Sequence, residues 1–168
     1  MIHTLSLHLI SSRDLTANSY TAFDLSSFSS LQTLRLDIPV GHAQFVLLDY
    51  ERLVWRYISN ILSTTSHLPL QDVTLVLQFN GKTTMQDLLD NSPTSMVRID
   101  HVLSRIPTLR KFKLLQRGAG PSEEELKRVG EMFEGLKERG VLDYRLADDE
   151  AEVEHLIEII PGLQATLW

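Results

Sequence analysis

The chain has 168 residues, 43% of them hydrophobic, enough for one domain with a sizeable core. It contains no cysteine, which excludes disulfides and thiolate metal sites, and its net charge of −6 with scattered basic residues argues against nucleic acid as the main ligand. The first residues include no basic region and only a short hydrophobic stretch, so we expect neither a signal peptide nor a membrane anchor. We therefore expect a single domain over residues 1–168 in an intracellular, cytoplasmic or nuclear protein.

Alternating apolar residues predict the first two strands. Residues 4–10 alternate as in a half-buried strand. The stretch 28–39, FSSLQTLRLDIP, places a leucine at every third position before an alternating run, which predicts a turn that leads into a strand over 33–38. Pro39 and Gly41 should end this strand, because both residues are poor in the middle of a sheet.

A long helix and a third strand are predicted next. Asp49 is a plausible N-cap for a helix whose apolar residues recur with a period of 3.6. These residues are Val54, Ile58, Ile61 and Leu62. Trp55 lies off this stripe, so we expect it at the flank or on the surface. Residues 72–79 predict a strand, and Val76 on its otherwise polar face suggests that this strand is central and covered on both sides.

Two helices and a fourth strand follow. Thr84 can cap a short helix that extends through Leu89. A second helix is predicted from Ser95 up to Pro107, because proline disfavours helical geometry in the residue before it. Residues 110–115 alternate again and predict the fourth strand.

The last third of the chain predicts two more helices around a fifth strand. Ser122 and Glu125 have the spacing of a capping box, and Gly140 suits the C-terminal end of that helix. Its buried stripe should consist of Leu126, Val129, Phe133 and Leu136. A strand is expected over 142–146, and the acidic residues 148–150 favour a final helix. That helix should bury Val153, Leu156, Ile157 and Ile160.

An LxxLxL pattern repeats along the chain. Four copies are visible, at Leu31, Leu34 and Leu36, at Leu70, Val73 and Leu75, at Leu109, Phe112 and Leu114, and at Val141, Tyr144 and Leu146. Their first residues recur after 39, 39 and 32 positions, which leaves room for a helix in each unit. Leu5, Leu7 and Leu9 resemble a further strand.

The regular succession of strand and helix, with connections too long for hairpins, implies a parallel sheet. We predict an α/β fold, a leucine-rich-repeat-like right-handed β-α solenoid with about five parallel strands and helices on the convex side. The alternative is an open, doubly wound parallel α/β sheet, which needs apolar residues on both faces of its strands. Polar alternate positions such as Arg35, Lys111 and Asp143 favour the solenoid.

Several phrases bring a family to mind. LQTLRLDIP, WRYISNILST, LQDVTLVLQF, IDHVLSRIPTLRKFKL and IIPGLQ resemble the leucine-rich-repeat-like C-terminal region of fungal F-box proteins, over about residues 31–168. In that family an N-terminal F-box docks onto a ubiquitin-ligase adaptor and the repeat region is taken to bind the substrate. We expect no F-box helices before Met1. The resemblance therefore implies the binding half alone, without adaptor docking, and leaves open a fragment of a longer F-box protein, a truncated product or a stand-alone relative.

Motifs for catalysis or metal binding are weak. The sequence FNGKTT after the third strand lacks the first glycine of a phosphate-binding loop, so Gly81 and Thr84 are better explained by a turn and a helix cap. The six histidines show no close ligand spacing, and the acidic residues 148–158 suit a solvated helix face. No GxSxG sequence occurs. We expect no catalytic residue, no metal and no cofactor.

The sequence thus favours a non-catalytic protein–protein interaction module over an enzyme. Its binding residues would be the outward residues of the strands, facing an unknown protein partner rather than nucleic acid or a membrane. These are Arg35, Asp37, Thr74, Gln78, Lys111, Lys113 and Arg145. The alternative is a small α/β enzyme or nucleotide-binding domain with its site at the carboxyl ends of the strands, near Gly81 and Gly118.

Overall fold

The structure is a computed structural model that describes residues 2–9, 24–40, 48–79, 84–91, 93–118, 120–147 and 156–159. In chain order the elements are β1 (Thr4–Leu9), β2 (Thr33–Val40), α1 (Leu48–Ser63), β3 (Asp72–Phe79), α2 (Met85–Asn91), α3 (Pro93–Leu103), β4 (Lys111–Arg117), α4 (Glu123–Met132), α5 (Glu134–Glu138), β5 (Leu142–Leu146) and β6 (Leu156–Ile159). The predicted bounds of β3 and β5 are confirmed, while α3 begins two residues before Ser95, at a proline that suits the first helical turn.

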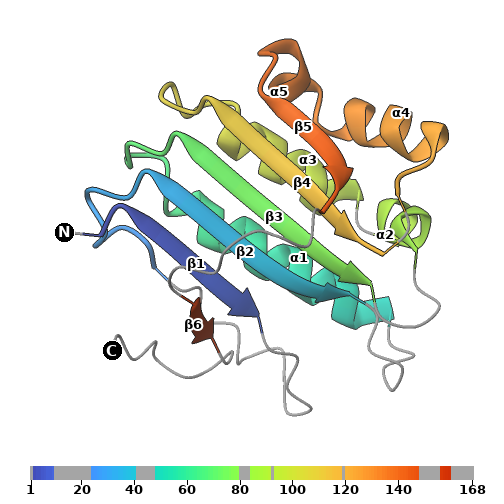
Figure 1. The fold of residues 1–168 in the computed structure, drawn as a ribbon, viewed down its shortest axis with the longest axis horizontal. Helices are drawn as coiled ribbons and strands as arrows, with labels where there is room; N and C mark the ends of the chain where they lie inside the picture. Colours follow the sequence, from blue (N-terminus) through green and yellow to red (C-terminus); the bar gives the residue numbers. More distant parts are fainter. Residues whose placement is uncertain are drawn as a thin grey trace.

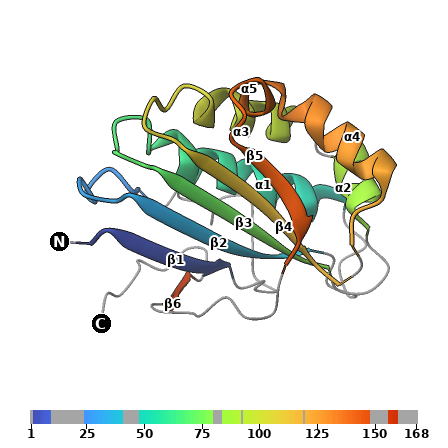
Figure 2. The same ribbon diagram turned by 45° about the horizontal axis from the view of Figure 1, so that its top comes forward.

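The six described strands form one parallel sheet in the order β5-β4-β3-β2-β1-β6. Strands β1 to β5 are therefore neighbours in chain order. Helices α1 to α5 lie on one face of the sheet, above the strands in Figure 2, and α1 and α3 are seen behind the strands in Figure 1. The protein is thus an α/β protein with an open parallel sheet, and its described helices do not cover both faces as a doubly wound sheet would require.

The 39-residue spacing has a counterpart in the backbone hydrogen bonds. Before β2, β3 and β4, two successive amides donate to one carbonyl of the preceding unit, at 2.8 to 3.1 Å. The amides of Gln32 and Thr33 donate to the His3 carbonyl. Those of Gln71 and Asp72 donate to the Gln32 carbonyl, and those of Arg110 and Lys111 donate to the Gln71 carbonyl. Each unit therefore begins its strand by the same contact with the unit before it.

The strand register confirms three copies of the repeat and corrects the fourth. Leu34 pairs with Val73, which pairs with Phe112, as the repeat predicts. Phe112 then pairs with Leu142 and not with Tyr144, so the copy predicted at Val141, Tyr144 and Leu146 begins two residues too late. A shift of two residues keeps every side chain on the same face of a strand, so alternation alone cannot detect this error.

The core lies between the sheet and the helices. Leu34, Leu36 and Leu75 are fully buried there, as are most apolar residues of the helix faces. Trp55 was expected at a flank or on the surface, but only 1% of it is exposed. Helix α1 packs against α3 as well as above the sheet, so it buries a wider arc than a single stripe, and Tyr57 is buried with it.

The helix predicted after Ser122 is two helices. The capping box is confirmed, because Glu125 N–H donates to the Ser122 hydroxyl and Ser122 N–H donates to the Glu125 carboxylate. The helix stops at Phe133, whose backbone (φ −109°, ψ 45°) separates α4 from α5, and the Phe133 ring packs 5.3 Å from that of Phe112. Val129, Phe133 and Leu136 of the predicted stripe are buried as expected, whereas Leu126 is 43% exposed.

Two other predicted caps are confirmed. Thr84 caps α2 by accepting a hydrogen bond from Asp87 N–H, and the Asp87 carboxylate accepts from the Thr84 hydroxyl and N–H. These bonds lower the pKa of Asp87, the side-chain bond contributing most. Gly140 follows α5 with a φ of +67°, in the left-handed region that glycine tolerates best. The prediction of Asp49 as an N-cap is wrong, because α1 already begins at Leu48.

The predicted final helix is wrong where the structure describes it. Residues Leu156–Ile159 form β6, which pairs with β1. A run of four mostly apolar residues is compatible with either a helix or a strand by its periodicity. Here it forms a strand because it pairs with the edge of β1. Val153 and Ile160 lie outside the described residues.

Pro39 does not end β2, which continues to Val40. The registered pairs between β1 and β2 stop at His8 and Asp37, so Pro39 lies beyond them. Proline has no N–H to donate, but at this position β1 has no residue paired with β2, so no hydrogen bond is lost. On its other side Pro39 pairs with Gln78 of β3.

Helices α3 and α5 cap each other. The Asp100 carboxylate of α3 accepts hydrogen bonds from the N–H groups of Gly135 and Leu136, at 3.1 and 2.9 Å, at the start of α5. A Cβ atom on Gly135 would lie 2.9 Å from this carboxylate, so the close approach needs glycine. The Arg139 guanidinium, just after α5, donates to carbonyls at the end of α3, including that of Ser104 at 2.6 Å. Each helix thus satisfies orphan backbone groups of the other.

Replacing Asp100 should test this mutual capping. We expect Asp100→Ala to lower the free energy of unfolding by about 1–2 kcal/mol, because two amides lose their acceptor. Asp100→Asn, which keeps one acceptor oxygen, should lose less. Urea unfolding followed by circular dichroism measures both. The control is Asp90→Ala, which removes an exposed ion pair with Arg128 worth no more than about 1 kcal/mol. Equal losses for Asp90→Ala and Asp100→Ala would contradict the capping role.

Candidate functional site

The seven residues predicted to bind a partner all lie on the strand face that no described helix covers, which we call the outer face. Alternate residues of β1 to β5 form it, and the parallel register sets them in rows across the strands. Its described side chains include Ser6, Arg35, Asp37, Thr74, Val76, Gln78, Lys111, Lys113, Leu115, Arg117, Asp143 and Arg145. Arg35, Thr74 and Lys113 stand side by side in one such row.

The middle of the outer face is buried. Val76 has no exposed surface, Asp37 keeps 4% and Leu115 keeps 8%. The expectation that β3 is a central strand buried on both sides is therefore confirmed. The exposed part of the outer face lies toward β4 and β5, where Arg117 and Arg145 are exposed. Alternation alone could not distinguish this exposed part from the buried centre.

Arg35 and Asp37 bond to each other along β2. The Arg35 guanidinium donates to both Asp37 oxygens, with distances of 3.1 to 3.2 Å, and the two side chains are 15% and 5% exposed. A carboxylate that is buried and bonded in this way has little surface left for a partner. Asp37 lies on the predicted face, but its contacts serve the fold.

The half of the outer face formed by β4 and β5 is basic. Lys111 Nζ and Arg145 Nε both lie 3.5 Å from the Asp143 carboxylate. Lys113 stands opposite Asp143 in the register, yet it has no carboxylate within ion-pair distance among the described residues. With Arg117, the described part of β4 and β5 places four cations and the Asp143 carboxylate on this face, and Asp72 of β3 lies opposite Lys111 in the register. The proximity of Arg145 to the lysines of β4 depends on the pairing of β4 with β5, so the sequence alone did not predict it.

Tyr144 and Gln116, on the helix side of β5 and β4, form a hydrogen bond with each other. The Tyr144 hydroxyl donates to Gln116 Oε1 at 2.6 Å, and Gln116 is 6% exposed. Burial, and secondarily the negative charge of Glu125, raises the pKa of Tyr144 well above its usual range. Tyr144 therefore stays protonated at neutral pH, where it acts as a hydrogen-bond donor.

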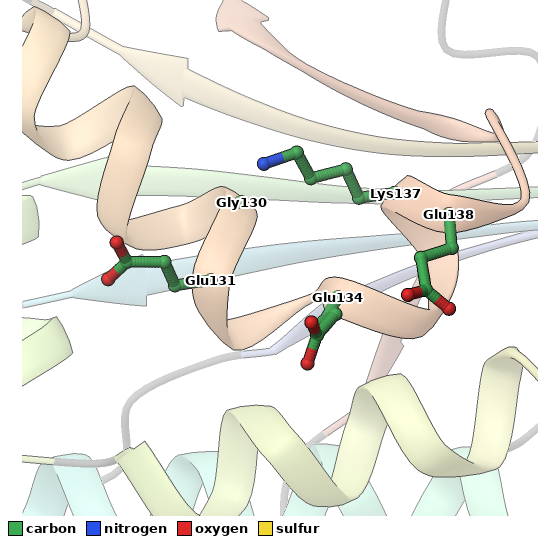
Figure 3. A pocket seen from close by; sticks show the side chains of 5 residues that line it. All are labelled: Gly130, Glu131, Glu134, Lys137 and Glu138. Atoms are coloured by element: carbon green, nitrogen blue, oxygen red, sulfur yellow. The ribbon is translucent and has the colours of Figure 1, made fainter.

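A pocket of about 440 Å³ lies on the surface of α4 and α5 (Figure 3). Its lining residues are Gly130, Glu131, Glu134, Lys137 and Glu138. The Lys137 side chain extends past Gly130, and the three carboxylates point in different directions (Figure 3). In the part of the chain that the structure describes, no group of three His, Cys, Asp or Glu side chains is placed to hold a metal ion. The pocket thus presents solvated charges without a convergent catalytic or metal-binding set.

Local structure explains the described residues of the FNGKTT and RGAG motifs. The Thr84 hydroxyl of the FNGKTT motif is bonded to Asp87 at the start of α2, and residues 80–83 lie outside the described part. Gly118, in the RGAG turn after β4, has a φ of +107°, a backbone conformation that side chains disfavour. Its place is therefore explained by the turn.

Comparisons with protein-family models, with curated proteins and with solved structures gave no match. Among the described helices, none has the length and apolar character needed to cross a membrane. The functional argument therefore rests on the geometry of the outer face.

Proposed function

We propose that this chain is a non-catalytic protein-interaction module, built as a leucine-rich-repeat-like β-α solenoid, that presents its outer face to a protein partner. The observation that supports this function is the one-sided sheet. Its helices lie on one face, and charged and polar side chains stand in cross-strand rows on the other (Figure 2). Repeat proteins commonly use such an extended strand face for binding.

The contact should centre on β4 and β5. Lys113, Arg117 and Arg145 supply positive charge there, whereas the β2 pair of Arg35 and Asp37 is satisfied internally. A partner surface with carboxylates would complement this charge, and charge complementarity mainly sets specificity and association rate. The resemblance to fungal F-box proteins suggests a narrower form of the proposal, in which this face holds the substrate of a ubiquitin ligase in the cytoplasm or nucleus.

Reversing the charge of Lys113 should test the proposed face. We expect Lys113→Glu to reduce capture of partner proteins by at least about tenfold, because opposed like charges replace a complementary contact. Immobilised wild type and variants would be incubated with a cell lysate, and the captured proteins quantified by mass spectrometry. Circular dichroism would verify that each variant is folded.

The matched control is Lys127→Glu, which changes the net charge equally. Lys127 is 77% exposed on α4, away from the outer face, and its one described ion pair is with Glu131 at 3.9 Å. Proteins that the wild type and Lys127→Glu retain but Lys113→Glu loses would be partners of the outer face. If all three chains capture the same proteins in the same amounts, the proposed face is wrong.

A further inference from the structure

Strand β5 is the last described strand at one end of the sheet, and part of its backbone bonds to no described strand. The Phe112 N–H of β4 donates to the Val141 carbonyl at 2.8 Å. The Ala147 N–H donates to the Gln116 carbonyl, also at 2.8 Å. In a parallel pair alternate residues bond to the same neighbour, so the residues between these positions at even numbers direct N–H and C=O away from β4. They are Leu142, Tyr144 and Leu146, and no described backbone group pairs with their outer side.

The sequence of β5, LDYRL, is self-complementary about Tyr144. Asp143 and Arg145, which carry opposite charges, lie on either side of this tyrosine. Leu142 and Leu146 are the next residues outward. If a second copy of β5 lies antiparallel with the two tyrosines opposite each other, Asp143 faces Arg145 of the second copy and Leu142 faces Leu146 of the second copy. Both charge pairs are then attractive, and every apolar residue meets an apolar residue.

The hydrogen-bonding positions agree with this register. Antiparallel strands alternate between residue pairs that exchange two hydrogen bonds and pairs that exchange none. The Tyr144 pair and both leucine pairs consist of residues whose backbone groups point outward, so they are the pairs that bond. Asp143 and Arg145 fall at the non-bonded positions, where opposite side chains lie closest.

Other registers are unfavourable. A shift of one residue would set outward backbone groups of one copy against groups of the other that already bond to β4. A shift of two residues would restore the backbone pairing but place Asp143 opposite Asp143 of the second copy, or Arg145 opposite its own counterpart. Like charges directly opposite each other destabilise a strand pair. The centred register is therefore the one in which backbone and side chains agree.

We propose that the chain forms a symmetric homodimer in which two β5 strands pair antiparallel about Tyr144 and join the two sheets. The contact is isologous, so it closes at two copies. Leu146 is 41% exposed, and pairing would cover it. Edge charges usually oppose pairing, but here the twofold arrangement brings together only opposite charges. This surface is the edge of the sheet, so the proposal goes beyond the partner-binding role of the outer face.

The strand is short, so we expect a weak dimer whose fraction rises with protein concentration. Sedimentation velocity of the whole chain over a series of concentrations should show wild type moving from monomer toward dimer mass. Asp143→Arg and Arg145→Asp each place like charges opposite one another at both symmetric positions. Each variant alone should raise the dimer dissociation constant at least about tenfold.

Mixing the two variants provides the decisive measurement. An equimolar mixture places two arginines of one chain opposite two aspartates of the other, so the mixture should dimerise about as well as wild type. Lys127→Glu is the control, because it changes the net charge by the same amount at a side chain that is 77% exposed on α4, and it should dimerise as wild type does. Circular dichroism confirms the fold of each chain, since Asp143 also contacts Lys111.

A wild type that stays monomeric at every concentration would overturn the proposal. Single variants that associate as wild type does, or a mixture that stays monomeric, would overturn it equally. Growth into species larger than a dimer would show open-ended pairing and would also count against it. Because the lysate experiment depends on Lys113 and this one on Asp143 and Arg145, each can fail without deciding the other.

Discussion

Leu34→Asp is expected to abolish cooperative folding. Leu34 has no exposed surface and lies in β2 on the side of the sheet that faces the helices. A carboxylate there would lose its hydration without gaining a cation, and the substitution also removes a core leucine. We expect a loss of at least about 4 kcal/mol, which is most of the stability of a typical domain.

Thermal and urea unfolding followed by circular dichroism would measure this loss. The matched control is Thr74→Asp, which introduces the same side chain on the opposite face of the neighbouring strand. Thr74 is half-buried between Arg35 and Lys113 in the register, so a new carboxylate there meets cations and should change stability by no more than about 1 kcal/mol. Leu34→Asp melting at the wild-type temperature would mean that the inward face of β2 is wrongly assigned.

Elements fixed by local chemistry could be predicted from the sequence. Strand β3 has the predicted bounds because Val73, Leu75, Leu77 and Phe79 alternate along it and polar residues flank it. The caps at Thr84, Ser122 and Gly140 also agree with the structure. In each case the residues that decide the conformation lie within a few positions of one another.

Features that depend on distant segments could not be predicted in this way. The four residues of β6 become a strand because β1 offers a free edge, and nothing near Leu156 in the sequence signals that edge. Trp55 is buried in the core although it lies off the predicted stripe of α1, a helix that also packs against α3. The shifted fourth repeat kept the correct faces, so only the pairing of Phe112 with Leu142 revealed the error.

The candidate site shows the same division. Alternation placed all seven predicted residues on one face, which needs only the two-residue period of a strand. It gave no information on how deeply each one is buried, so Asp37 was predicted as a contact residue although its carboxylate is bonded to Arg35. The self-complementary edge became visible only once β5 was known to be the last strand of the sheet.

The second large effect is expected from Arg35→Ala. In the native chain Asp37 is 4% exposed, and this change removes the guanidinium that donates to both oxygens of its carboxylate. Removing one partner of a buried ion pair costs about 3–5 kcal/mol. Asp37→Ala should cost less, about 1–2 kcal/mol, because Arg35 is longer and more exposed and can turn its charge toward water.

The double variant Arg35→Met with Asp37→Leu separates the charge pair from mere packing. If the pair only compensates its own burial, replacing both residues by apolar ones should leave the free energy of unfolding within about 1 kcal/mol of wild type, although Arg35→Ala is severely destabilised. Urea unfolding of the three variants gives the comparison. Losses that are equal for the two single variants, or a double variant as unstable as Arg35→Ala, would mean that the burial of Asp37 does not control stability here. The asymmetric result would instead explain why this pair belongs to the fold, and why binding to the outer face is better tested at Lys113.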